Sequence, residues 1–283
     1  MLVTGKEILQ DAHKNNYAVG AFNVNNMEIV QAIIEAAEET NSPVILQASQ
    51  GGLKYAGVEY IAELGKLAAR NAKVPVAVHL DHGTDFEQVM LCIRHGFTSV
   101  MIDGSRFNLE DNIAITKKVI EVAHAVGVSV EAELGKIGGT EDNITVDERE
   151  ATFTDPEEAK RFVDETNVDY LAIAVGTAHG PYKGEPKIDF DRIKAIKEIT
   201  NIPLVLHGSS GVPADSIKEA VSLGINKINI DTDLRIAFSN AVKEFIKENP
   251  ENIDPRKILG PAKEAMKEAI IEKMQLFGSA GRA

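Results

Sequence analysis

Residues 76–83 read Val-Ala-Val-His-Leu-Asp-His-Gly, an apolar run that ends in two residues capable of acid–base or metal chemistry. Near-continuous apolar character is typical of a strand that is covered on both faces, as in a parallel sheet flanked by helices. Residues 170–175 (YLAIAV) and 203–207 (PLVLH) have the same character. These stretches predict a parallel α/β fold.

Eight such runs alternate with helical patterns along the chain, with a repeat of about 30 residues that is typical of βα units. The expected strands are 17–24, 43–48, 75–80, 98–103, 128–133, 169–175, 203–207 and 225–231. We therefore predict a single (β/α)₈ TIM barrel spanning 1–283, with an additional C-terminal helix near 261–276. A doubly wound open sheet is the alternative, but its glycine-rich first turn is replaced here by NVNN.

Two local signals predict where helices begin. Thr84 with Glu87 fits a capping box, and Asp155 before Pro156 fits an N-cap followed by a first-turn proline.

Composition excludes several classes of partner. Thirty Lys and Arg against 43 Asp and Glu give a net charge of −13, which disfavours nucleic acid and anionic membranes. The single cysteine, Cys92, cannot form an internal disulfide and suits a reducing compartment. The N-terminus carries charges where a signal peptide needs an apolar core, and no apolar run approaches the roughly 18 residues of a membrane span. We expect a soluble, cytoplasmic protein.

Active sites of such barrels lie at the carboxyl ends of the strands. Three histidines follow three different predicted strands: His82, His179 and His207. Three imidazoles with an open fourth position make a catalytic zinc site, although each histidine alone is equally well explained by hydrogen bonding. Asp103 and Glu133 end the neighbouring strands, where they are suited to hold a second cation or to orient the histidines.

The remaining histidines, His13, His79, His95 and His124, are expected to have structural roles, and Cys92 to lie in the core.

The late strands predict an anion site. Residues 208–211 (GSSG) and 229–232 (NIDT) supply small residues, backbone N–H groups and hydroxyls where barrels often bind phosphate. Asp81, beside His82, is placed to exchange protons with a metal-bound substrate or to orient an imidazole. Residues 135–153 form a long, glycine-hinged acidic segment that is typical of a lid and that contains Glu141.

These motifs resemble one family closely. YAVGAFNVNN (17–26), HLDHG (79–83), EAELG (131–135), GTAHG (176–180) and LVLHG (204–208) are similar to the class II, zinc-dependent ketose-bisphosphate aldolases over essentially the whole chain. The resemblance implies reversible cleavage of fructose 1,6-bisphosphate to dihydroxyacetone phosphate and glyceraldehyde 3-phosphate, a step of glycolysis and gluconeogenesis. The tagatose 1,6-bisphosphate epimer is the alternative substrate, although NIDTDLR (229–235) looks more like the fructose enzymes.

The resemblance also implies a role for each site residue. His82, His179 and His207 would bind the catalytic Zn²⁺, and Asp103 and Glu133 a second divalent cation. Asp81 would be the general acid/base, and Glu141 the lid acid that moves the C3 proton. Ser49 would contact the glyceraldehyde 3-phosphate half. The dihydroxyacetone phosphate site, with a monovalent cation (Na⁺ or K⁺) nearby, would comprise Gly180, Gly208, Ser209, Ser210, Asn229, Ile230, Asp231 and Thr232. Family members are usually homodimers or homotetramers.

Three other functions compete with this one. A Schiff-base aldolase needs a lysine inside the barrel, and Lys227 on the last strand is the candidate, although it lies low in the barrel. A zinc hydrolase of similar architecture and a non-catalytic sugar-phosphate binding protein are the others. Arg282 is expected either to lie in a frayed tail or to meet a substrate phosphate.

Overall fold

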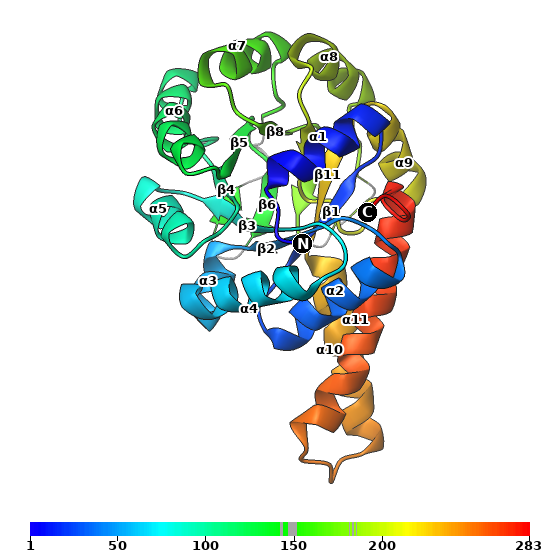
Figure 1. The fold of residues 1–283 in the computed structure, drawn as a ribbon. Coiled ribbons are helices and arrows are strands. Elements are labelled where there is room, and N and C mark those ends of the chain that lie inside the picture. The colour runs from blue at the N-terminus through cyan, green and yellow to red at the C-terminus, as the bar shows by residue number, and fades with distance from the viewer. Residues whose placement is uncertain (142–143, 147–151, 181, 183, 185) are drawn as a thin grey trace.

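The computed structural model describes residues 1–141, 144–146, 152–180, 182, 184 and 186–283. Eight parallel strands close into a barrel, which confirms the predicted (β/α)₈ architecture (Figure 1). Their order around the barrel is β1-β11-β10-β8-β5-β4-β3-β2. The barrel strands are β1 (Val19–Asn23), β2 (Val44–Ala48), β3 (Val76–Gly83), β4 (Ser99–Ile102), β5 (Ser129–Leu134), β8 (Tyr170–Ile173), β10 (Leu204–Leu206) and β11 (Ile225–Ile230).

Helices surround the barrel. Those of the described residues are α1 (Gly5–Asn15), α2 (Met27–Glu39), α3 (Gln50–Ala56), α4 (Val58–Asn71), α5 (Phe86–Arg94), α6 (Leu109–Ala125), α7 (Pro156–Thr166), α8 (Phe190–Thr200), α9 (Ala214–Ser222), α10 (Thr232–Glu248) and α11 (Pro255–Phe277). A separate three-stranded sheet, in the order β7-β6-β9, is formed by β6 (Gly138–Glu141), β7 (Ile144–Val146) and β9 (Ala178–His179).

The main core lies between the barrel and its helices. The apolar stripe of α2 buries Ile29, Ala32, Ile33, Ala36 and Ala37 against the barrel. Burying one such isoleucine side chain contributes about 1.5–3 kcal/mol. Both faces of each strand are thereby covered, as the apolar runs predict.

Helix α1 closes the amino-terminal end of the barrel. Its apolar residues Ile8, Leu9 and Ala12 join a second core cluster with barrel residues. Gly5 lies so close to the hydroxyl of Tyr170 that a Cβ at this position would overlap it. The accessible end of the barrel is therefore the opposite one, at the carboxyl ends of the strands.

The C-terminal helix is longer than expected. It begins at Pro255 and contains Pro261 in its interior, because Asp254 caps it through the Arg256 N–H and Pro255 occupies the first turn. This is the same Asp-Pro signal that correctly predicts the start of α7, where the Asp155 side chain accepts from the Glu157 and Glu158 N–H groups. Helices α10 and α11 lie side by side and extend away from the barrel (Figure 1).

The tail after α11 is bound to the rest of the molecule. The Gly281 N–H donates to the Thr40 carbonyl, and the Arg282 guanidinium lies 5.4 Å from the Tyr17 ring centre. Neither expectation for Arg282 describes this arrangement, since the residue is not frayed and lies against the Tyr17 ring.

The Thr84–Glu87 capping box is wrong. Asp85 is the N-cap of α5, and its side chain accepts from the Gln88 N–H. Thr84 instead accepts a hydrogen bond from the Gln50 side chain, 2.9 Å away.

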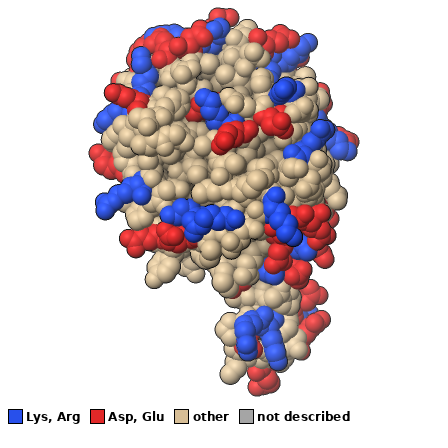
Figure 2. All heavy atoms as spheres, in the orientation of Figure 1, with Lys and Arg blue, Asp and Glu red and all other residues tan. Residues whose placement is uncertain are grey.

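The surface carries both signs of charge. Figure 2 shows acidic and basic side chains interspersed over the visible face. Among the described residues, none of the helices is both long and apolar enough to cross a membrane.

Candidate active site

An irregularity in β3 places two adjacent side chains in the barrel mouth. The register of β3 against β4 shifts between Leu80 and Gly83, and His82 has a positive φ of 49°. Regular strand alternation would send Asp81 and His82 to opposite faces. The shift and the left-handed backbone of His82 bring both to the site, at a conformational cost that is common in functional sites.

The three predicted histidines converge. His82 Nε2 lies 2.9 Å from His207 Nδ1, and the ring centres of His82 and His179 are 5.2 Å apart. One ligand atom from each of the three lies within 4.8 Å of the others. These imidazoles come from β3, β9 and the end of β10, so distant segments build the cluster. A set of three imidazole nitrogens fits a tetrahedral metal ion with one open position.

A carboxylate binds the ring nitrogen of His82 that points away from the other two histidines. Its Nδ1 lies 3.0 Å from Asp103 Oδ2, which leaves Nε2 facing the other histidines. Burial alone would raise the pKa of Asp103, but hydrogen bonds from His82 and Ser105 outweigh it and hold the pKa at about 2. His82, Asp103 and Glu133 form a second cluster that could hold a cation. Asp103 is therefore placed to fill either of the roles expected for it, orienting His82 or holding a second cation.

Asp81 is buried and surrounded by amides. Its Oδ1 accepts from Asn229 Nδ2 at 3.1 Å, and its Oδ2 accepts from Gln47 Nε2 at 3.0 Å. Asn23 Nδ2 lies 3.4 Å from the same Oδ2. These donors from β11, β2 and β1 hold the carboxylate in one orientation, with its oxygens as acceptors.

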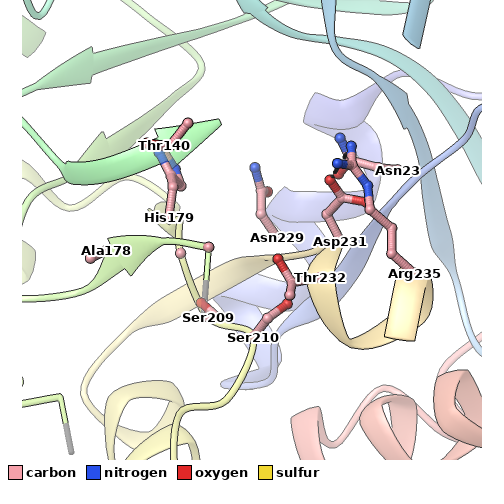
Figure 3. A pocket seen from close by; sticks show the side chains of 12 residues that line it. Asn23, Thr140, Ala178, His179, Ser209, Ser210, Asn229, Asp231, Thr232 and Arg235 are labelled. Atoms are coloured by element: carbon pink, nitrogen blue, oxygen red, sulfur yellow. Dashed lines mark hydrogen bonds and ion pairs between the residues drawn. The ribbon is translucent and has the colours of Figure 1, made fainter. Parts of the chain in front are cut away.

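A polar pocket adjoins the histidines (Figure 3). Most residues expected to form the phosphate site line it. The lining residues are Asn23, Thr140, Ala178, His179, Gly180, Gly208, Ser209, Ser210, Asn229, Asp231, Thr232 and Arg235. The amino-terminal end of α10 lies beside this pocket, where the helix dipole favours a negative charge.

The side chain of Ile230 does not face the pocket. It is 1% exposed and belongs to the core between barrel and helices, because strand alternation turns it away from Asn229 and Asp231. Ser49 caps α3 by accepting from the Gly52 N–H at 3.2 Å.

Sequence reasoning missed two residues here. Arg235 lines the pocket and pairs with Asp231, with Nε 2.8 Å from Oδ1. The Tyr182 hydroxyl accepts from the Ala178 N–H at 2.8 Å and donates to the Gly208 carbonyl at 2.7 Å, joining two loops of the pocket. The i, i+4 spacing of Asp231 and Arg235 at the start of a helix is a signal that could have indicated the pair.

The predicted lid is joined to a histidine of the cluster. Strand β6 pairs with β9, so that Gly139 lies opposite His179. Gly139 has a φ of +101°, and a Cβ there would overlap the backbone of His179. The backbone of Glu141 ends β6 opposite Ile144, but its side chain lies outside what the structure describes.

Polar groups also lie beneath the histidines, inside the barrel. Lys227 Nζ is 2.8 Å from Glu131 Oε2, and both side chains are fully buried. Burial opposes ionisation of Glu131, but Lys227, His207 and His79 together hold its pKa well below the usual value. Sequence reasoning assigned no role to Glu131. The ion pair holds the Lys227 ammonium, which argues against Lys227 as a Schiff-base nucleophile.

The other histidines have protein partners. His79 Nδ1 lies 2.6 Å from Ser99 Oγ, and burial followed by repulsion from Lys227 lowers the pKa of His79 to about 4. His124 bonds Asp169 at 2.9 Å. His13 and His95 lie, respectively, beside Lys197 and at the C-cap of α5. Cys92 is buried in the core.

The chain is similar to aldolases over its full length. The family described as Fructose-bisphosphate aldolase class-II matches residues 3–282. The chain is 52% identical to a fructose-bisphosphate aldolase of Thermus caldophilus and 49% identical to one of Geobacillus stearothermophilus. These matches cover 100% of this chain and 100% and 99% of those proteins. The crystal structure of the YdjI aldolase from Escherichia coli K12 superposes with a TM-score of 0.88 at 38% identity, with 100% of both chains covered. The chain belongs to the class-II fructose-bisphosphate aldolase family and is an aldehyde-lyase.

Proposed function

We propose that this enzyme reversibly cleaves fructose 1,6-bisphosphate to dihydroxyacetone phosphate and glyceraldehyde 3-phosphate, using zinc held by His82, His179 and His207. The observation that carries the proposal is the convergence of three imidazoles beside a polar pocket and a buried carboxylate. Zinc at this position supplies a Lewis acid that polarises the ketose carbonyl. His82 Nε2 and His207 Nδ1 are the nitrogens that face the shared position.

Asp81 takes the proton of the C4 hydroxyl as the C3–C4 bond breaks. Its amide donors keep the carboxylate oriented, and its place beside His82 puts it next to the reacting atoms. Glu141, at the end of β6, then protonates C3 of the triose. In the reverse reaction, Glu141 removes the proton from C3 and Asp81 returns a proton to the C4 oxygen.

The pocket binds the phosphate of the dihydroxyacetone phosphate half. The residues that line it include Gly180, Gly208, Ser209, Ser210, Asn229, Asp231 and Thr232. Backbone N–H groups at the start of α10 stabilise the phosphate. A monovalent cation, Na⁺ or K⁺, would bind near it and offset its charge. Ser49 contacts the glyceraldehyde 3-phosphate half, and Asp103 and Glu133 would hold a second divalent cation.

A comparison of the two C4 epimers tests the substrate. We expect kcat/KM for fructose 1,6-bisphosphate to exceed that for tagatose 1,6-bisphosphate. Equal or faster turnover of the tagatose epimer would overturn the substrate assignment. Hydrolysis of phosphoesters without triose formation would indicate a zinc hydrolase, and tight binding without turnover in zinc-loaded protein a sugar-phosphate binding protein.

We propose a cytoplasmic homodimer or homotetramer. The projecting helical hairpin supports assembly, because Ile236, Ile246 and Ile253 are 50%, 46% and 91% exposed on it. Light scattering at several concentrations should give the mass of two or four chains. A mass of one chain at micromolar concentration would contradict assembly.

A further inference from the structure

Two buried charged side chains have no part in the reaction proposed above. Glu131 on β5 and Lys227 on β11 are each 0% exposed and meet across the barrel interior, with Nζ 2.8 Å from Oε2. A buried ion pair costs several kcal/mol of desolvation per ion and is often no more stabilising than apolar packing. Its presence beneath the histidines therefore calls for a reason other than stability.

The second oxygen of Glu131 supplies that reason. Its Oε1 lies 2.8 Å from Nε2 of His207. Because an ionised carboxylate only accepts hydrogen bonds, Nε2 has to carry the imidazole proton. The lone pair of a neutral His207 is then on Nδ1, the atom that lies 2.9 Å from His82 Nε2. Glu131 therefore selects both the tautomer and the ring orientation of His207.

Lys227 and His79 fix the carboxylate itself. Lys227 Nζ and His79 Nε2 both lie against Oε2, at 2.8 and 3.3 Å. His79 is held in turn through Nδ1 by Ser99 Oγ, 2.6 Å away. Oε2 thus faces Lys227 and His79 at ion-pair distance, and Oε1 is directed at His207.

We propose that Glu131, held by Lys227, is a positioning residue that keeps His207 protonated on Nε2 and presents Nδ1 to the metal. The inference rests on the proposed zinc site, but it concerns metal binding and not turnover. A hydrogen-bonded partner of a metal-ligating histidine typically changes metal affinity by about 10–100-fold when it is replaced. Neither Glu131 nor Lys227 lines the pocket.

The test measures zinc affinity of the metal-free protein by competition with a chromophoric chelator. We expect Glu131→Gln to weaken zinc binding about 10–100-fold while circular dichroism stays unchanged. Asp169→Asn is the matched control. Asp169 is also buried and bonds a lysine and a histidine, Lys6 and His124, at 2.9 Å each, but at the closed end of the barrel. This variant should bind zinc as tightly as the parent protein.

A second measurement needs no folded variant at position 131. Nitrogen-15 histidine spectra of the parent protein report the His207 tautomer, assigned by the loss of its signal in His207→Asn. We expect protonated Nε2 with and without zinc. A proton on Nδ1, or a folded Glu131→Gln with parental zinc affinity, would overturn the proposal. If the parent protein binds no zinc at all, the proposed function itself fails, which is a separate result.

Discussion

Asn229 Nδ2 lies 3.1 Å from Asp81 Oδ1, joining the last strand of the barrel to the third across its mouth. With Gln47 on the other oxygen, this contact fixes the direction of a buried carboxylate. The proposed general base is thus positioned by residues from strands that are far apart in sequence.

Replacing this carboxylate by an amide should abolish proton transfer but preserve shape. We expect Asp81→Asn to lower kcat about 10²–10⁴-fold, because an amide cannot accept the C4 hydroxyl proton. Zinc content, measured by elemental analysis, should stay at the parental value. A variant with near-parental kcat would show that another group accepts the proton.

Arg235 should contribute to phosphate binding. The loss of a charged hydrogen bond of about 1.5–3 kcal/mol predicts that Arg235→Met raises KM for fructose 1,6-bisphosphate about 10–100-fold, with a smaller change in kcat. The matched control is Arg161→Met, since Arg161 is similarly exposed and paired but lies on an outer helix with Glu110 and Glu165. An equal KM in the two variants would remove Arg235 from the phosphate site.

Gly139 should tolerate no side chain. Gly139→Ala places a Cβ against the His179 backbone and forces an unfavourable φ, so it should separate β6 from β9 and weaken zinc binding. Gly127→Ala carries comparable φ strain, at +74°, but its Cβ would meet no atom within 4 Å. Zinc affinity measured for both variants by chelator competition distinguishes the effect of the steric overlap at position 139 from the effect of backbone strain. Equal zinc affinities would contradict a coupling between β6 and the His179 segment.

His79 should make stability depend on pH. Its pKa is about 4 in the fold, against 6.5 in the unfolded chain, so the unfolded state binds an extra proton between these values. Stability from this group is therefore lost as pH falls from about 6.5 to about 4, by roughly 3 kcal/mol in total.

The difference between parent and His79→Gln isolates this effect from the other histidines. We expect the advantage of the metal-free parent in urea unfolding to shrink over this pH window and to level off below it. Parallel stability curves would mean that His79 does not titrate as stated.

Periodicity and strand ends suffice to predict the barrel and most of the site. All eight barrel strands fall on predicted runs, because strands covered on both faces leave a strong apolar signal. The sequence predicts that the three histidines lie close together, because the carboxyl ends of all the barrel strands lie on the same rim of the barrel. The sequence signal at Asp254-Pro255 also marks the true start of α11.

Other features depend on register and geometry that the sequence does not display. The Glu131–Lys227 contact crosses the barrel interior. Predicting it requires knowing how far along the barrel axis β5 and β11 lie relative to each other. The left-handed backbone at His82 breaks strand alternation, which periodicity cannot indicate. The motif does not show that the side chain of Ile230 points into the core, which leaves only its backbone to contact a phosphate.

The central claim is a metal mechanism, and the most direct test is fructose 1,6-bisphosphate cleavage before chelation, after EDTA and after zinc is restored. A parallel sample is treated with borohydride in the presence of dihydroxyacetone phosphate. We predict activity that is lost on chelation, regained with zinc and unaffected by borohydride. Activity that survives complete metal removal and is destroyed by borohydride would contradict the three-histidine site and point to Lys227.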